Sequence, residues 1–224
     1  NLAAMGMLVA VIGTLLHHEI VSYTWIIVGL LVGSLIGSVM ALKVSMNALP
    51  QRQAISLAFG ALAATLVGVA EYMRGGAELG SFKMTALGFE VLFGSLTIAG
   101  SLIAFAKLQE LIRGTPLTFK GQNIFNIALF ATTIGIFLYL IAAPENTILF
   151  YVMLGLAFLF GLLLVLPIGA ADMPVVMSLM NSYAGLASAA TGFALNNNVL
   201  IIAGTLDGFS GFILSILMCK AMNR

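Results

Sequence analysis

Long hydrophobic runs fill almost the whole chain, and polar residues gather in the short segments between them. A helix needs about 20 residues to cross the ~30 Å hydrocarbon core of a bilayer. The pattern therefore predicts eight transmembrane helices, near residues 2–17, 23–42, 49–72, 84–107, 123–143, 147–167, 174–194 and 198–219. Such continuous runs do not fit a membrane β-barrel, whose strands alternate in polarity over about ten residues. We expect an all-α integral membrane bundle.

The composition supports this interpretation. Hydrophobic residues make up 61% of the 224 residues and charged residues 8%, whereas soluble domains carry about 25% charged residues. The mean hydropathy is +1.13. The first run is short, and the chain begins with Asn1 and not with Met. Both features are compatible with a fragment that lacks one N-terminal helix. No basic residue precedes that run, so it does not resemble a signal peptide.

The distribution of basic residues predicts the topology. With the C-terminus in the cytoplasm or matrix, one side carries Lys43, Arg52, Lys107, Arg113, Lys120, Lys220 and Arg224. The other side carries Arg74 and Lys83. Because cytoplasmic loops are enriched in lysine and arginine, we expect this orientation and an even number of crossings.

Several kinds of chemistry are excluded by the residues available. No glycine-rich loop follows a predicted strand, and no cysteine and histidine set has metal-ligand spacing. The two histidines, His17 and His18, are one adjacent pair at the end of the first run. This supply of histidine does not favour a catalytic triad. Cys219 is the single cysteine and cannot form an internal disulfide. We expect no catalytic residue, no metal site and no cofactor in this segment, with lipid and protein rather than nucleic acid as partners.

Two carboxylates lie inside predicted membrane helices. Glu90 lies about a third of the way into the fourth run, on the face of Gly94, Thr97 and Ser101. Asp207 lies near the middle of the eighth run. A charged aspartate at that depth costs ~2.5–3.5 kcal/mol, so each acid is neutral, paired or hydrated in a cavity. Intramembrane acids mark ion or proton routes, and a neutral hydrogen-bonded structural acid is the alternative.

Small and polar residues form stripes on the last two helices. At 100° per residue, the eighth run aligns Gly204, Gly208, Gly211 and Ser215. The seventh run aligns Ser178, Asn181, Ser182, Gly185 and Gly192. Close approach of two helix backbones explains most of these residues. The amide of Asn181 needs hydrogen-bond partners in hydrocarbon, and a bond between helices and a role in a pathway both remain open.

The other polar residues have simpler interpretations. Asp172 precedes Met173 and Pro174, and a carboxylate before a proline-initiated helix is typical of a helix cap. We expect the acids at the ends of runs and in the links to be solvated: Glu19, Glu71, Glu78, Glu110 and Glu145. The two histidines are expected to be a hydrated interfacial pair, with pH sensing as the alternative.

Two long segments resemble a known family. They are GAADMPVVMSLMNSYAGLASAATGFALNNNVLIIAGT (169–205) and LSILMCKAMNR (214–224), with weaker support from GSLIAFAKLQ (100–109) and PLTFKGQNIFN (116–126). Together they resemble the membrane domain of the beta subunit of proton-translocating NAD(P) transhydrogenase. The ADMPVV and NSYAG strings are long enough to be specific.

The resemblance implies that the chain conducts protons for hydride transfer from NADH to NADP+, with protons moving inward. It implies that NAD(H) and NADP(H) bind to soluble domains outside this segment, and that the NADP(H)-binding domain follows residue 224. The implied partners are the membrane helices of the alpha subunit, both nucleotide domains and a second copy of the assembly. The implied location is a bacterial inner membrane or the mitochondrial inner membrane.

The resemblance also implies roles for individual residues. It places Asn181, Thr133, Ser210 and Ser215 on the proton pathway, with a serine often found at the Thr133 position. Coupling to the NADP(H) domain is implied for Asp172 and for the run that ends at Arg224. Helix packing and movement are implied for Gly192, Gly204, Gly208 and Gly211.

The chain departs from the family pattern at several positions. Lys83 stands where some members carry a histidine, Glu90 replaces a small residue and Asp207 replaces an apolar residue. Phe209 replaces a small residue beside it. The proton carrier therefore comes either from a partner subunit or from Glu90 and Asp207.

Two other functions predict different features of the sequence. A stand-alone transporter of cations or small solutes predicts two related halves with broken helices, and the sequence shows no such symmetry. A purely structural membrane subunit leaves Asp207 and Glu90 unexplained.

Overall fold

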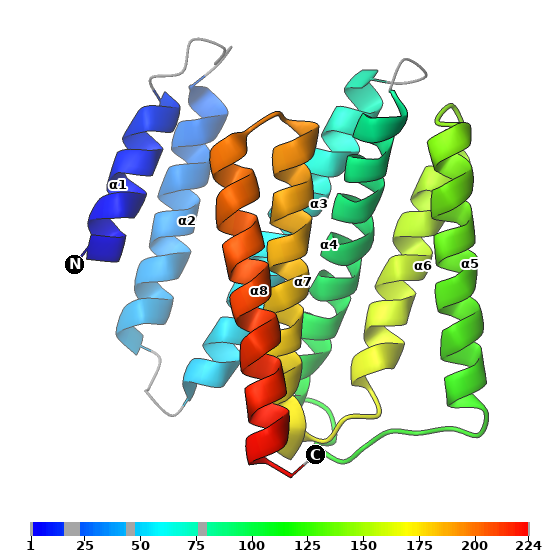
Figure 1. Ribbon diagram of the computed structural model, residues 1–224. Coiled ribbons are helices and arrows are strands. Elements are labelled where there is room, and N and C mark those ends of the chain that lie inside the picture. Colours follow the sequence, from blue (N-terminus) through cyan, green and yellow to red (C-terminus); the bar gives the residue numbers. More distant parts are fainter. Residues whose placement is uncertain (1, 16–22, 44–47, 76–79, 224) are drawn as a thin grey trace. The chain divides into compact units, whose positions relative to one another are not determined.

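The computed structural model describes residues 2–15, 23–43, 48–75 and 80–223, and these form eight α-helices and one short 3-10 helix (Figure 1). They are α1 (Leu2–Leu15), α2 (Thr24–Lys43), α3 (Leu49–Gly75), α4 (Ser81–Leu108), α5 (Gln122–Ala142), α6 (Thr147–Val165), η3 (Ala170–Asp172), α7 (Met173–Ala194) and α8 (Asn198–Ala221). The predicted all-α membrane fold is confirmed.

Six helices in the described part of the chain are long and apolar enough to cross a membrane, namely α2, α3, α4, α5, α6 and α8. The chain is thus a multi-pass membrane protein. The 14 residues of α1 are too few, and the serines, asparagine and glycines of α7 lower its hydropathy. The start of α4 was predicted at residue 84, but the helix begins at Ser81. Lys83 therefore lies in the first turn of α4 and not before the helix.

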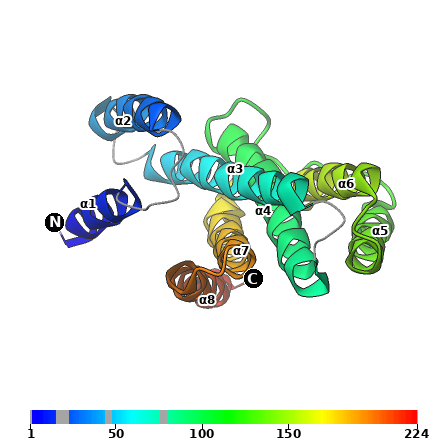
Figure 2. The ribbon, with the colours of Figure 1, turned by 90° about the horizontal axis from the view of Figure 1, so that it is seen from above.

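The chain divides into two compact units, Asn1–Met46 and Asn47–Arg224. In the first unit, α2 carries Gly29, Gly33 and Gly37 with open space beside each. In the second unit, α4 is the central helix and contacts α3, α5, α6 and α7 (Figure 2). We call the end of this unit at which α8 finishes the C-terminal end. The end of α3 and the start of α4, together with the links from α5 to α6 and from α7 to α8, lie at the opposite end (Figure 1).

Two clusters of apolar side chains hold the second unit together. The cluster at the opposite end contains Tyr72, Met84, Ala86, Leu87, Val91, Phe137, Leu140, Phe150, Met153 and Ala194. The ring of Tyr72 stacks on Phe150 at a centroid distance of 3.8 Å, and its hydroxyl donates to the Pro144 carbonyl at 2.6 Å. The cluster at the C-terminal end contains Ala54, Leu96, Ala104, Val165, Met173, Val176, Met177 and Met180.

Helices α7 and α8 form an antiparallel hairpin around a three-residue turn, 195–197 (Figure 1). Asn196 has a φ of 53°, a conformation that asparagine tolerates better than most residues. The side chain of Asn197 accepts from the Leu200 N–H at 3.1 Å and caps α8. The asparagine string 196–198 is therefore the local cause of the hairpin.

The backbones of α7 and α8 touch at their glycines. A Cβ built on Gly185 would lie 2.3 Å from the Gly208 nitrogen, and one on Gly204 would lie 2.4 Å from the Ala189 nitrogen. A Cβ on Gly192 would lie 2.6 Å from the Ile201 nitrogen. Real Cβ atoms do not come this close, so these positions admit only glycine without movement of a helix.

Two loops are joined at the C-terminal end. The loop between α4 and α5 meets the segment between α6 and α7 through two backbone hydrogen bonds. Leu117 N donates to the Leu166 carbonyl at 3.1 Å, and Ala170 N donates to the Gly114 carbonyl at 2.8 Å. The segment that leads from α6 to Asp172 is therefore held in place by the loop between α4 and α5.

Candidate functional site

A groove of about 880 Å³ runs beside α7 and α8 and includes the beginning of α3. We call it the α7–α8 groove. Its polar lining residues are Gln53, Ser178, Asn181, Asp207 and Ser210. The Asn181 amide donates from Nδ2 to Asp207 Oδ1 at 3.1 Å, which links the two helices. Ser178 Oγ donates to the Gly211 carbonyl at 2.8 Å. The groove thus gathers one acid, two amides and two hydroxyls beside α7 and α8.

Asp207 is exposed in this chain although it lies near the middle of α8. Nine steps of 1.5 Å along the helix place it about 14 Å from the start of α8, well inside the hydrocarbon depth. An unpaired carboxylate at that depth is costly, and Asn181 accounts for one oxygen. The remaining acceptor capacity requires water in the groove or a polar group from another helix.

Glu90 occupies a different and fully enclosed place. It is 0% exposed, and neither carboxylate oxygen has a hydrogen-bond partner among the described residues. The side chain lies against Gly68 of α3, where an added Cβ would be 3.0 Å from Glu90 Cδ. It also lies beside Thr191 of α7, whose hydroxyl donates to the Ala187 carbonyl at 3.0 Å. Burying an unpaired charge is very costly, so this position suits a carboxyl group that carries a proton.

The structure brings some of the predicted pathway residues together and separates others. Ser210 lies in the groove beside Asp207 and donates to its backbone carbonyl at 2.9 Å. Ser215 is buried one turn beyond Gly211, one of the glycines of α8 that contact α7. Thr133 lies on α5, which packs against α6 and α4. Its buried hydroxyl donates to the Leu129 carbonyl of its own helix at 2.8 Å.

Asp172 stands at the N-cap position of α7, as predicted. Asp172 is the last residue of η3 and directly precedes α7, but its side chain makes no capping hydrogen bond. Pro174 lies in the first turn as predicted. Pro174 has no N–H, which leaves fewer donors for a cap at this helix start. Arg224, His17 and His18 lie outside the described residues.

Lys107 is a buried residue that the sequence patterns did not single out. Its side chain is 1% exposed and donates from Nζ to three carbonyls at the end of α6. The distances are 3.5 Å to Val165, 2.5 Å to Leu166 and 2.6 Å to Ile168. One signal in the sequence was available, because the last turn of α6 has no basic residue of its own. The carbonyls that end a helix need donors from elsewhere.

The prediction that Glu71 is solvated is wrong. Its side chain is 15% exposed and accepts from Lys83 Nζ at 2.9 Å, across the interface between α3 and α4. It also pairs with Arg74 at 3.3 Å within α3. Opposite charges at facing ends of two consecutive helices were the signal for this pair.

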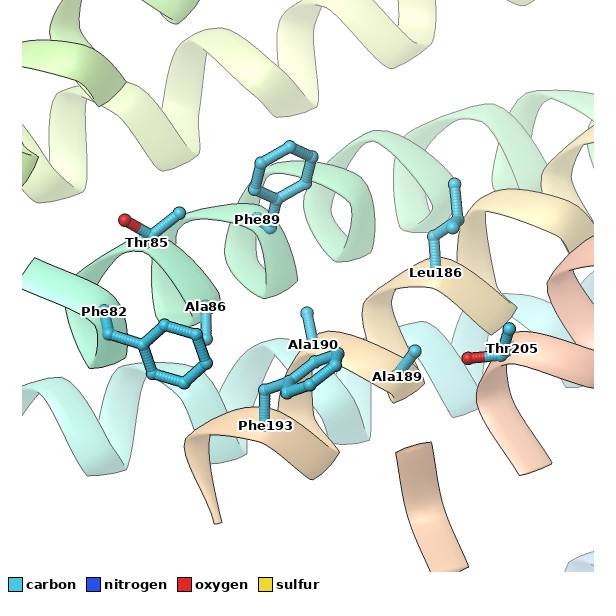
Figure 3. A pocket seen from close by; sticks show the side chains of 9 residues that line it. All are labelled: Phe82, Thr85, Ala86, Phe89, Leu186, Ala189, Ala190, Phe193 and Thr205. Carbon is cyan, nitrogen blue, oxygen red and sulfur yellow. The ribbon is translucent and has the colours of Figure 1, made fainter. Parts of the chain in front are cut away.

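A second groove, of about 310 Å³, lies at the opposite end and has an apolar lining (Figure 3). Figure 3 shows side chains from α4, α7 and α8 around it, including Phe82 and Phe193. These two rings meet edge to face at 6.1 Å. Its two hydroxyls, of Thr85 and Thr205, both donate to carbonyls of their own helices. This groove offers no free polar group and suits hydrocarbon.

Replacing Asn181 with alanine is expected to lower the free energy of unfolding by less than about 1 kcal/mol. Hydrogen bonds between membrane helices average about 0.6 kcal/mol, and Asp207 is already exposed. The measurement is unfolding of the full-length protein in detergent, with Ser182→Ala as the control on the same helix. A loss of unfolding free energy above about 2 kcal/mol contradicts the expectation that this hydrogen bond contributes little to stability.

Comparison with known proteins gives the family of this chain. The model of the NAD(P) transhydrogenase beta subunit family matches residues 1–224. Two curated relatives named NAD(P) transhydrogenase subunit beta, both from Rhodospirillum rubrum and one from a named strain, are each 43% identical over 233 residues. The match covers 100% of this chain and 50% of each relative, so the chain spans about half the length of these relatives. The resemblance seen in the sequence is confirmed, and the chain belongs to the NAD(P) transhydrogenase beta subunit family.

Proposed function

We propose that this chain is the proton-conducting membrane part of an NAD(P) transhydrogenase, in which inward proton movement drives hydride transfer from NADH to NADP+. The observation that carries the proposal is the Asn181–Asp207 hydrogen bond in the α7–α8 groove, in a chain of this family. A stand-alone transporter is not favoured, because the family model covers the whole chain.

Hydride transfer is assigned to other parts of the assembly. A dinucleotide is typically held where a strand leads through a glycine-rich loop into a helix. The described ranges contain helices and loops without such a unit, so these residues do not fit NAD(H) or NADP(H). We place the NADP(H)-binding domain in the polypeptide that follows residue 224, and the NAD(H)-binding domain in a partner chain.

The proposed proton pathway uses the polar residues inside the bundle. Asn181 and Asp207 hold water or a polar side chain of the alpha subunit in the groove, with Ser210 and Ser215 along α8. Glu90 and Thr133 supply buried polar groups on α4 and α5. A change in the protonation of this set alters how tightly α7 and α8 pack at Gly192, Gly204, Gly208 and Gly211.

Coupling is proposed to run through the C-terminal end. Asp172 lies there at the start of α7, and the chain leaves α8 there toward Arg224. In the described part of the second unit this end carries five basic residues, Arg52, Lys107, Arg113, Lys120 and Lys220, against Arg74 and Lys83 at the opposite end. The bias supports a cytoplasmic or matrix position for the C-terminal end, in a bacterial or mitochondrial inner membrane. The proposed assembly contains two copies.

The test is proton movement by the complete complex in lipid vesicles. The unmodified complex is expected to change the lumenal pH as nucleotides are exchanged. One charge moved through 100 mV is worth ~2.3 kcal/mol, which is enough to bias a nearly balanced hydride exchange. Asp207→Asn and Glu90→Gln are expected to lower the ratio of protons moved to hydride transferred at least tenfold. The replaced groups have nearly the same shape, so packing is conserved. Glu145→Gln, at an exposed acid, is the control.

The vesicle measurements distinguish the proposed function from the identity of the proton carrier. Rapid nucleotide exchange by the unmodified complex without any change in lumenal pH contradicts the proposed function. Full coupling in both the Asp207→Asn and the Glu90→Gln variants leaves the function in place and moves the proton carrier to a partner subunit.

A further inference from the structure

Glu71 and Lys83 form a cross-helix ion pair directly beyond the buried Glu90. Lys83 Nζ lies 2.9 Å from Glu71 Oε2, and the two side chains are 39% and 15% exposed. Arg74 also contacts Glu71, at 3.3 Å, but its side chain is 82% exposed. Lys83 is therefore the cation that joins α3 to α4 at this end of the bundle.

Helix register places this pair in line with Glu90. Glu90 contacts Gly68, and Glu71 lies three residues after Gly68, one turn further along the same face of α3. Lys83 lies seven residues before Glu90, two turns away on the same face of α4. Glu71 and Glu90 are close enough to interact electrostatically. The two acids are thus successive polar groups along the α3–α4 interface.

Leu87 lies between the ion pair and Glu90 on α4. It is three residues before Glu90, four after Lys83, and 0% exposed. Together with Val91, which is also 0% exposed, it belongs to the apolar cluster at this end. Bulk water therefore does not reach Glu90 along this face without movement of Leu87.

We propose that Glu71 is a further proton-carrying residue, which exchanges protons between the solution at this end and Glu90. In one direction, a proton from water binds the Glu71 carboxylate, and when Leu87 moves aside the carboxyl group gives that proton to the Glu90 carboxylate. Glu71 returns to its pair with Lys83, and Glu90 is left as the neutral acid. Lys83 is a positioning residue that holds Glu71 toward α4. The inference rests on the proposed function and adds a route of entry that does not use the α7–α8 groove.

The two unpaired oxygens of Glu90 are the independent support for this route. The described neighbours of Glu90 include Gly68 and Thr191, and Thr191 spends its hydroxyl hydrogen on Ala187. No donor in the described residues satisfies the Glu90 oxygens. A buried carboxylate without donors is costly, so Glu90 is stable here while it carries a proton and becomes an unpaired charge only when it releases that proton.

The experiment uses the complete complex in vesicles with the opposite end facing the medium that is monitored. Glu71→Gln is expected to slow nucleotide-driven proton movement at least tenfold, and Lys83→Gln severalfold. Arg74→Gln is the matched control, since Arg74 also contacts Glu71 but is exposed, and its rate is expected within twofold of the unmodified complex. Sodium formate added on that side is expected to restore much of the rate to Glu71→Gln, because a small weak acid replaces the missing proton carrier.

The outcomes separate this inference from the proposed function. If the unmodified complex pumps and Glu90→Gln does not, while Glu71→Gln pumps normally, this inference is wrong and the function stands. A slow Glu71→Gln variant that formate does not restore shows a structural role and also overturns the inference. Should Glu71→Gln fail to assemble, Lys83→Gln decides: a rate within twofold of the unmodified complex contradicts the proposal, and rescue of a slow rate by Lys83→Arg supports it.

Discussion

Replacing Gly185 with alanine is expected to disrupt the α7–α8 hairpin and to lower the free energy of unfolding by about 3 kcal/mol. The added Cβ would lie 2.3 Å from the Gly208 nitrogen, 2.6 Å from the Gly208 Cα and 2.9 Å from the Gly204 carbonyl oxygen. All three neighbours are backbone atoms, so no rotation of a side chain relieves the contact. The measurement is unfolding of the full-length protein in detergent, together with the yield of assembled complex.

The chain offers graded controls for this substitution. Gly135→Ala and Gly155→Ala add a Cβ where nothing lies within 4 Å, and a gain of up to about 1 kcal/mol is expected from helix propensity. Gly208→Ala meets its first neighbour at 3.3 Å and should fall between these limits. Equal stability of the Gly185→Ala and Gly135→Ala variants contradicts the close backbone contact between α7 and α8.

Replacing Lys107 with methionine is expected to destabilise the C-terminal end by about 3 kcal/mol. The methionine keeps the volume of the side chain but removes the donor for the Val165, Leu166 and Ile168 carbonyls. Buried acceptors that lose a charged donor are left with the full cost of their desolvation. Hydrogen exchange of residues 163–172 in the full-length protein is expected to increase more than that of α5. Coupling of proton movement to nucleotide exchange is expected to fall as well, because the same loop leads to Asp172.

Two variants test whether the effect comes from the three carbonyls. Lys120→Met removes an exposed lysine from the same end and is expected to change stability by less than about 0.5 kcal/mol. Lys107→Arg keeps the charge, but a planar guanidinium does not place three donors around one point as an ammonium does. We expect it to restore less than half of the loss. Indistinguishable Lys107→Met and Lys120→Met variants count against this account.

The course of the helices could be predicted from the sequence because each apolar run is bounded by polar or turn-forming residues. The predicted starts of the spans at 49, 147 and 198 agree with the helices that begin at Leu49, Thr147 and Asn198. The start of α4 was missed because a lysine within a helix looks the same in sequence as a lysine beyond its end. Its pairing with Glu71 depends on how α3 and α4 face each other.

The candidate site could be predicted only in part. The cost of an acid in hydrocarbon pointed to Glu90 and Asp207, and their depth follows from position along each helix. Which acid meets which partner depends on the rotation of neighbouring helices, so the bond from Asn181 to Asp207 could not be foreseen. The burial of Lys107 could not be foreseen for a related reason. A long basic side chain near the end of a run usually reaches water, and only the packed end of α6 turns it inward.

The hairpin of α7 and α8 also bears on how the polypeptide enters the lipid during translation. α7 falls short of the apolarity that six other described helices reach, and α8 carries an aspartate near its middle. The turn of residues 195–197 keeps both helices within reach of each other once α8 has left the ribosome. The hydrogen bond from Asn181 to Asp207 and the close contacts of the glycine backbones become available once both helices have been made. We therefore expect the two segments to leave the translocon as a pair, and a truncation after residue 195 is expected to leave α7 at the membrane surface.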